Sequence, residues 1–98
     1  MRSGRDNVAK AFGKVLKEQR EARGLSQEGL AARCEISRSY PSLLERGLRT
    51  PTVETLMQVA DVLSMRATDL VTLTLEKCQA LEALKQEFQT RRKATAAQ

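Results

Sequence analysis

Two short helical segments follow one another within residues 26–47, and this spacing constrains the fold more than any other feature of the chain. Ser26 is a helix N-cap residue in front of a segment over 27–34, and Ser37 caps a second segment over 37–46. Only two residues separate the two segments. The sequence therefore predicts a pair of short helices joined by a tight turn.

Helical patterns flank this pair on both sides. Before it, the Asp-Asn pair at 6–7 can cap a helix over about 7–23, and after it Thr52 opens a helix over about 52–63. A further pattern starts at 68–69. The apolar positions at helical spacing are Val8, Phe12, Val15, Leu16, Leu30, Ala31, Cys34, Leu43, Leu44, Val53, Leu56, Met57, Val59, Ala60 and Leu63.

Length and composition agree with one small helical domain. The 98 residues are 41% hydrophobic but only 3% aromatic, which favours a core of Leu, Val, Ile and Ala. The predicted fold is all-α with five helices. Residues 1–70 form the main domain, and residues 71–98 form an extended C-terminal helix whose last residues, 91–98, are expected to fray.

One apolar stripe of the C-terminal helix exceeds what a four-helix core needs. We predict that this stripe forms a homodimer interface. The alternative is that the helix folds back onto the first helix of the same chain. The residues of the stripe are Leu70, Leu81, Leu84 and Phe88.

The net charge of +5 lies entirely in the first half of the chain. Residues 1–50 carry eleven Lys or Arg against six Asp or Glu, whereas residues 51–98 carry six of each. A basic half indicates a polyanionic partner, although a charge run alone is more often a solvated face.

Several classes of function are disfavoured by what the sequence lacks. Cys34 and Cys78 lie far apart without a C-x-x-C motif or any His, so no metal site and no cofactor is expected. Both thiols are interpreted as core residues in a reducing cytoplasm. No stretch approaches ~18 apolar residues, and no nucleophile–base group is present. We therefore expect a cytoplasmic protein that is neither an enzyme nor membrane-bound.

The paired short helices have the spacing of a helix-turn-helix, whose second helix can enter the major groove of DNA. Arg38, Ser39 and Ser42 occupy the side of that helix away from the core, and Arg38 can donate two hydrogen bonds to guanine. Arg46 and Arg49 are expected to contact the DNA backbone. The amide groups at Ser37, at the helix N-terminus, favour phosphate.

Residues 20–56 make the expectation of a helix-turn-helix more specific. They read R-E-A-R-G-L-S-Q-E-G-L-A-A-R-C-E-I-S-R-S-Y-P-S-L-L-E-R-G-L-R-T-P-T-V-E-T-L. This run resembles the lambda-repressor and Cro type of helix-turn-helix, the XRE family of transcriptional regulators. Its L-S-Q-E, S-R-S-Y and L-E-R-G elements carry the resemblance, which covers about residues 8–70. The resemblance implies a lambda-repressor-like DNA-binding domain.

The same resemblance implies roles for single residues. Gln27 would contact a phosphate and brace the recognition helix, and Tyr40 would touch the DNA backbone. Arg20 would pair with Glu45 and lie near a phosphate, the alternative being an exposed ion pair worth ~0–1 kcal/mol. The residues expected to face base edges are Arg38, Ser39, Ser42 and Leu43.

Three residues depart from the family pattern. Glu35 stands where the turn often has Gly, and Gly29 replaces a better helix former. Pro41 stands where many relatives have Ile or Leu, and it removes one backbone N–H near the helix start. A helix start near residue 38 is preferred here to a start at Pro41.

The sequence therefore predicts a sequence-specific transcriptional regulator, a repressor in preference to an activator. It would bind a palindromic double-stranded DNA operator as a homodimer, with helix 37–46 in the major groove. The alternative is a protein-interaction module, such as an antitoxin or co-regulator, that acts through its C-terminal helix on an unidentified partner. Restriction–modification controllers, phage repressors and antitoxins all resemble the chain at this size.

Overall fold

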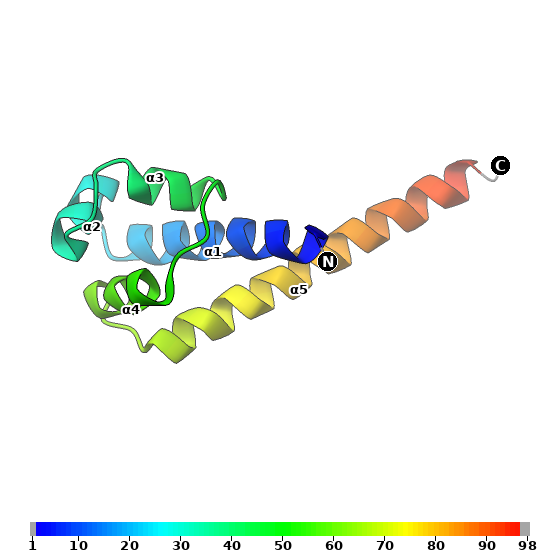
Figure 1. Ribbon diagram of the computed structural model, residues 1–98. Helices are drawn as coiled ribbons and strands as arrows, with labels where there is room; N and C mark the ends of the chain where they lie inside the picture. Colours follow the sequence, from blue (N-terminus) through cyan, green and yellow to red (C-terminus); the bar gives the residue numbers. More distant parts are fainter. Residues whose placement is uncertain (1, 97–98) are drawn as a thin grey trace.

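The computed structural model describes residues 2–96, with the side chains of residues 7–91. The predicted all-α fold with five helices is confirmed, and no strand occurs in the described part of the chain. In Figure 1, α3 lies on one side of α1 and α5 on the other. The helices are α1 Arg2–Ala22, α2 Gln27–Cys34, α3 Tyr40–Glu45, α4 Val53–Val62 and α5 Ala67–Ala96.

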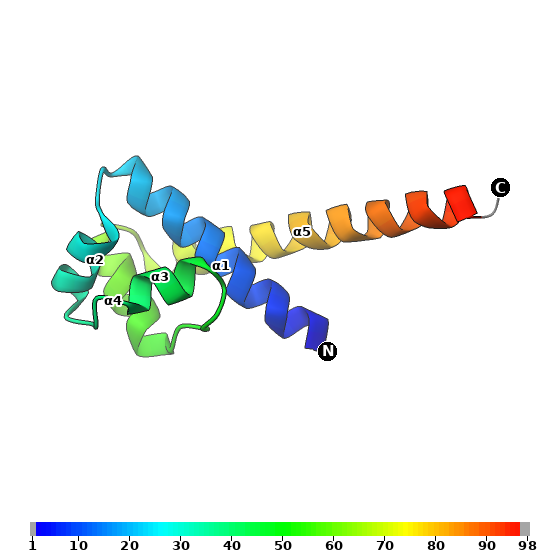
Figure 2. The same cartoon turned by 90° about the horizontal axis from the view of Figure 1, so that it is seen from above.

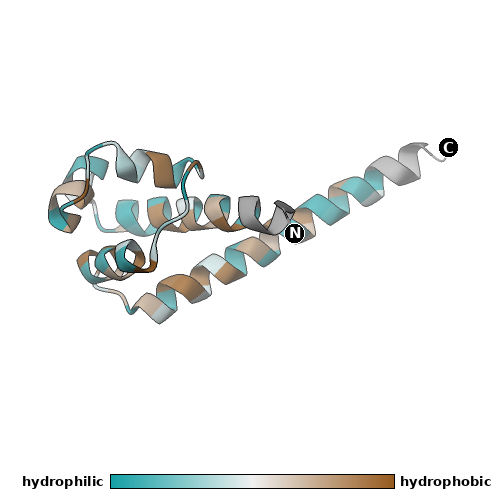
Figure 3. Cartoon of the chain, viewed as in Figure 1, coloured by the Kyte–Doolittle hydropathy of each residue, from teal (hydrophilic) through white to brown (hydrophobic). Residues whose placement is uncertain are grey.

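The core is built from the inner sides of all five helices. α1 packs most extensively against α5 and next against α3, while α2 packs on α4 and α3. In Figure 3 hydrophobic positions recur along α1 and in the first turns of α5. The buried cluster consists of Phe12, Val15, Leu16, Leu30, Cys34, Leu44, Val59, Ala60, Leu63 and Leu70.

The capping signals in the sequence position α2 and α4 as predicted. The Ser26 hydroxyl accepts a hydrogen bond from Gly29 N at 2.9 Å, and the Thr52 hydroxyl accepts one from Thr55 N at 3.1 Å. α2 ends at Cys34, and its C-cap Glu35 has a φ of +56°, so this turn position is left-handed although it carries no Gly. Five residues, 35–39, join α2 to α3 rather than the two predicted.

Near its N-terminus α1 differs from the prediction. The helix begins at Arg2, so residues 6–7 do not cap it. Asn7 is instead buried, and its side chain donates a hydrogen bond to Glu82 Oε1 in α5 at 3.1 Å. Val8 was expected on the apolar stripe but is 41% exposed.

The start of α3 was also predicted wrongly. The helix spans Tyr40–Glu45 rather than 37–46, with Ser39 and not Ser37 at the N-cap. Because Pro41 has no N–H, the Ser37 carbonyl cannot accept the usual helical bond from residue 41. That carbonyl accepts from Tyr40 N at 3.1 Å instead, which forms a tight turn ahead of the helix. The Pro41 ring is fully buried, so it occupies an apolar position of the core.

The last helix folds back onto α1 over only part of its length. Its first half packs on α1, and its remaining part extends away from the other helices as the arm, residues 83–96, seen in both views (Figures 1 and 2). Leu70 is fully buried in the chain's own core, so its assignment to a dimer interface was wrong. Residues 91–96 of the expected frayed tail are helical; residues 97–98 lie outside the described residues.

Candidate nucleic-acid interface

The helix α3 has a buried side and an exposed side. Pro41 and Leu44 lie one helical turn apart and point into the core, with Tyr40 half-buried beside them. Gly13 in α1 allows this close approach, because a Cβ at that position would overlap the Leu44 carbonyl oxygen and lie 2.6 Å from that of Glu45. The packing therefore fixes which side of α3 faces outward.

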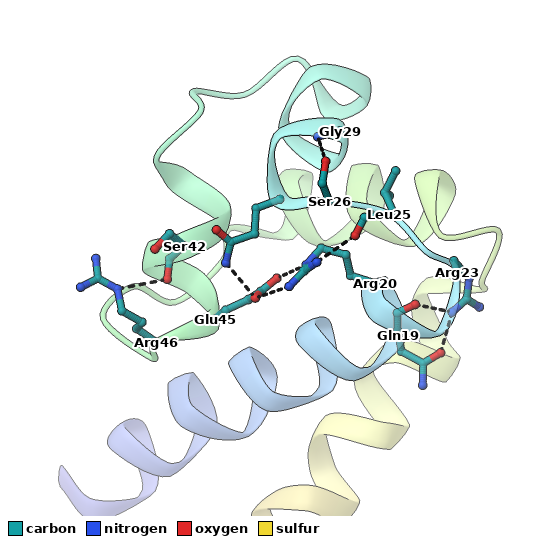
Figure 4. Close-up of polar contacts among 10 residues, drawn as sticks. Gln19, Arg20, Arg23, Leu25, Ser26, Gly29, Ser42, Glu45 and Arg46 are labelled. Atoms are coloured by element: carbon teal, nitrogen blue, oxygen red, sulfur yellow. Dashed lines mark hydrogen bonds and ion pairs between the residues drawn. The ribbon is translucent and has the colours of Figure 1, made fainter.

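A buried ion pair locks the end of α3 to α1 and α2. Arg20 Nε and Nη2 donate to the two carboxylate oxygens of Glu45 at 2.6 and 3.0 Å, and Gln27 Nε2 donates to the same carboxylate at 3.0 Å. The two side chains of the pair are 10% and 4% exposed. Figure 4 shows Arg20 and Glu45 facing each other inside the motif. This confirms the predicted pair and rejects the alternative of an exposed one.

The third nitrogen of Arg20 is also used inside the protein. Its Nη1 donates to the Leu25 carbonyl at 2.8 Å, so every guanidinium nitrogen has a partner. The hydrogen bonds that Arg20 donates to Glu45 raise the pKa of Arg20 above its usual range, against the opposing effect of burial. This geometry gives Arg20 a structural role and does not support the expected phosphate contact.

The outward side of α3 carries the four residues expected to face bases. Ser39 and the Arg38 side chain are exposed, the latter to 81%, while Ser42 and Leu43 are half-buried. Ser39, Ser42 and Leu43 are spaced by one helical turn and lie opposite the buried positions. The structure thus brings the predicted base-reading residues to one surface, with Arg38 extending from the turn before the helix.

The residues expected to contact the DNA backbone divide into two groups. Ser37, Arg46 and Arg49 are exposed, and Arg46 bends back so that its Nε donates to the Ser42 carbonyl at 3.4 Å. Tyr40 is half-buried against the core, and the side chain of Gln27 is held by Glu45. The exposed residues Ser37, Arg46 and Arg49 flank α3 in the sequence. Gln27 and Tyr40 instead help to hold α3 against the rest of the protein.

Two residues near this surface were missed by the sequence reasoning. Glu28 forms a 2.6 Å ion pair with Arg38 Nη2, linking the first turn of α2 to the turn before α3. Gly13 was not singled out, although a glycine inside an amphipathic helix is a signal of close backbone approach. Nothing in the spacing of Glu28 and Arg38 marks them as partners, because their contact depends on the turn geometry.

The described residues carry no sign of two other kinds of site. Across residues 7–91 no three His, Cys, Asp or Glu side chains gather in a way that could hold a metal ion. Within the described helices, none is both long and apolar enough to cross a membrane. The thiols of Cys34, which is buried, and Cys78, which is half-buried, form no disulfide, and burial raises the pKa of each.

Comparison with protein families and curated proteins points in one direction. A family described as helix-turn-helix matches residues 16–70. The chain is 41% identical over 70 residues to an uncharacterized HTH-type transcriptional regulator, y4dJ, of Sinorhizobium fredii. That match covers 71% of this chain and 91% of the relative.

Two solved structures extend the comparison to the whole fold. The clp gene regulator ClgR from Corynebacterium glutamicum matches with a TM-score of 0.78 and 25% identity, over 93% of this chain and 96% of that one. The restriction-modification controller protein C.AhdI from Aeromonas hydrophila matches with a TM-score of 0.61 and 37% identity, over 63% of this chain and 94% of its own. The ClgR match therefore includes most of α5.

Proposed function

This chain belongs to the helix-turn-helix family of DNA-binding transcriptional regulators, of the XRE type, and we propose that it acts as a sequence-specific repressor. It binds a palindromic operator as a homodimer, with α3 in the major groove. Repression follows from occupancy, because a bound dimer excludes polymerase from the same DNA. The protein acts in the cytoplasm, where it meets the DNA.

One observation carries this proposal: α3 is flanked by exposed basic residues on its outward side, while the opposite side of the helix is fixed in the core. The Arg20–Glu45 pair and the Pro41 packing hold the helix in one orientation. Arg38 is then presented at 81% exposure, with Arg46 and Arg49 exposed nearby in sequence. A rigid helix with a forked donor at its leading end is what guanine recognition requires. The exposed arginines supply the sequence-independent contacts to phosphate.

The arm supports the homodimer part of the proposal. Leu84 and Phe88 are 62% and 65% exposed although both are large and apolar. Together with Leu81 they line a groove between α1 and α5 that is bordered by lysines. A second copy would bring the same apolar side chains to this groove, which suits a two-fold interface.

The same groove favours one second candidate function. An amphipathic acidic helix of another protein could occupy it, as expected for an interaction module such as an antitoxin or co-regulator. In that case the arm and not α3 would carry the activity. DNA binding without any preferred sequence would support this alternative.

Selection of bound duplexes from a random pool tests the proposal. We expect a palindrome whose half-sites lie about one DNA turn apart, ~34 Å. With the selected site, Arg38→Ala should cost about 1–3 kcal/mol and relax the preference at one base pair in each half-site. Affinity should fall with salt by about 0.9 log units per log unit of salt for each phosphate neutralised.

Arg49→Ala is the matched control for this experiment. It removes the same charge from an exposed position that we assign to the DNA backbone, so it should weaken all sequences alike and reduce the salt slope by about one. Equal losses on all sequences for Arg38→Ala as well would overturn Arg38 as a base reader. Recovery of no preferred sequence would overturn the sequence-specific function itself.

A further inference from the structure

The exposed ion pair between Glu28 and Arg38 places a carboxylate at the surface that should face DNA. Glu28 Oε1 lies 2.6 Å from Arg38 Nη2, and the two side chains are 71% and 81% exposed. DNA phosphates repel a carboxylate, so an acid at this position weakens binding unless it has another effect. Glu28 is therefore an unexpected residue on a basic surface.

The geometry of the pair leaves most of the Arg38 guanidinium available. Only Nη2 donates to Glu28, and among the described residues neither Nε nor Nη1 of Arg38 has a partner. An arginine has five N–H donors in a fixed fork, and a guanine uses two of them. Arg38 can thus hold Glu28 and a guanine edge at the same time.

We propose that Glu28 is a positioning and specificity-determining residue, which acts by holding Arg38 for a base edge and away from the neighbouring phosphates. This inference rests on the proposed function. It explains how Arg38, the residue assigned to read a base, distinguishes one base pair from another. Without Glu28, the long arginine side chain is free to reach the nearest phosphate, a contact that reads no sequence. With Glu28 in place, a move of Arg38 to phosphate would leave the carboxylate unpaired beside the DNA.

The strength of the pair depends on whether DNA is bound. In water an ion pair between exposed side chains is weak, since solvent screens it and both side chains lose rotamer freedom. When DNA covers the surface, water is displaced, the local dielectric constant falls, and the interaction becomes stronger. Glu28 therefore acts chiefly in the complex and contributes little to the stability of the free protein.

The test measures base discrimination and salt dependence of the full chain carrying Glu28→Gln. We expect discrimination at the base pair read by Arg38 to fall at least about five-fold, and binding to unrelated duplexes to become tighter. The salt slope on unrelated duplexes should steepen by about 0.9, as one more phosphate is neutralised. In Glu28→Gln/Arg38→Ala the steepening should disappear, because Arg38 makes the additional contact.

Glu54→Gln is the matched control. Glu54 is also an exposed acid in the first turn of a helix, so its removal changes the net charge and the helix-dipole interaction equally. Equal changes in discrimination for the two variants would overturn the role of Glu28, and so would a steeper slope that persists without Arg38. If the wild-type protein discriminated no base pair at all, the proposed function would fail; a normal wild-type preference that Glu28→Gln leaves intact would reject this inference alone.

Discussion

The two ends of the molecule differ in how far their apolar side chains are buried. The body, residues 7–82, buries one cluster of apolar residues and holds α3 in place with the Arg20–Glu45 pair. The arm, residues 83–96, continues the same helix as α5 but leaves Leu84 and Phe88 in solvent. The molecule consequently measures 55 × 26 × 24 Å. The body has its own buried core within one chain, whereas Leu84 and Phe88 of the arm pack into no core in the described residues.

The ion pairs of the two regions give the sharpest form of this comparison. Arg20–Glu45 is bidentate and almost fully buried, whereas Arg91–Glu87 in the arm is an i,i+4 pair with side chains 78% and 58% exposed. Breaking a buried pair leaves an uncompensated charge in the interior. The same substitution should therefore cost much more stability in the body than in the arm.

The largest effect is expected for Glu45→Ala. This change strands Arg20 in the interior and removes the acceptor of Gln27, so it should lower the free energy of unfolding by about 3–5 kcal/mol. The matched change Glu87→Ala should lower it by less than about 0.5 kcal/mol. Denaturant unfolding followed by circular dichroism measures both. Similar losses for the two variants would contradict the distinction between body and arm.

A smaller but qualitatively different effect is expected in the arm. Replacing Leu84 and Phe88 together by Ser should weaken self-association at least about 100-fold, because both side chains are assigned to the dimer interface. The unfolding temperature of the dilute monomer should hardly change, since these residues do not contribute to the core. Analytical ultracentrifugation over a range of concentrations provides the dissociation constant.

The control for the arm variant is a pair of equally exposed apolar residues on the body. Val53 and Met57 in α4 are 73% and 58% exposed. Val53→Ser/Met57→Ser should leave association unchanged. If it dissociated the dimer and the arm variant did not, the interface would lie on α4 and the arm would be free for another partner.

The smallest expected effect concerns pH. Burial raises the pKa of the Cys34 thiol above its ordinary value of 9.0, so the folded protein retains a proton that the unfolded chain releases. Its contribution to stability is complete below about pH 9 and is lost as the pH rises through the folded pKa. Unfolding measured from pH 8 to 10.5 under reducing conditions should show a shallower decline for Cys34→Ala. An identical decline in the variant would exclude the thiol as its cause.

Much of the fold followed from local signals. The bounds of α2 were predicted correctly because the Ser26 cap and the left-handed position at Glu35 are local features of the backbone. The same holds for the start of α4 at the Thr52 cap. The Arg20–Glu45 pair was predicted from family resemblance, since a separation of 25 residues gives no periodic signal.

The errors lie where a distant element changes a local preference. The body residue Leu70 was assigned to the interface because it shares a stripe with Leu84, and only the packing of α5 on α1 separates their environments. The contact of Asn7 with Glu82 likewise depends on α5. The contact of Glu28 with Arg38 required the course of the turn over 35–39, which spacing does not specify.

The sequence by itself determined an all-α chain, a helix-turn-helix and the set of residues around the recognition helix, because caps, stop signals and apolar periodicity act within a few residues. The tertiary structure decided which of these residues remain available to DNA or to a partner. It buried Arg20, exposed Arg38 beside Glu28, and divided α5 into a packed half and an arm. Burial is decided by contacts between residues far apart in the chain, and no local pattern specifies them.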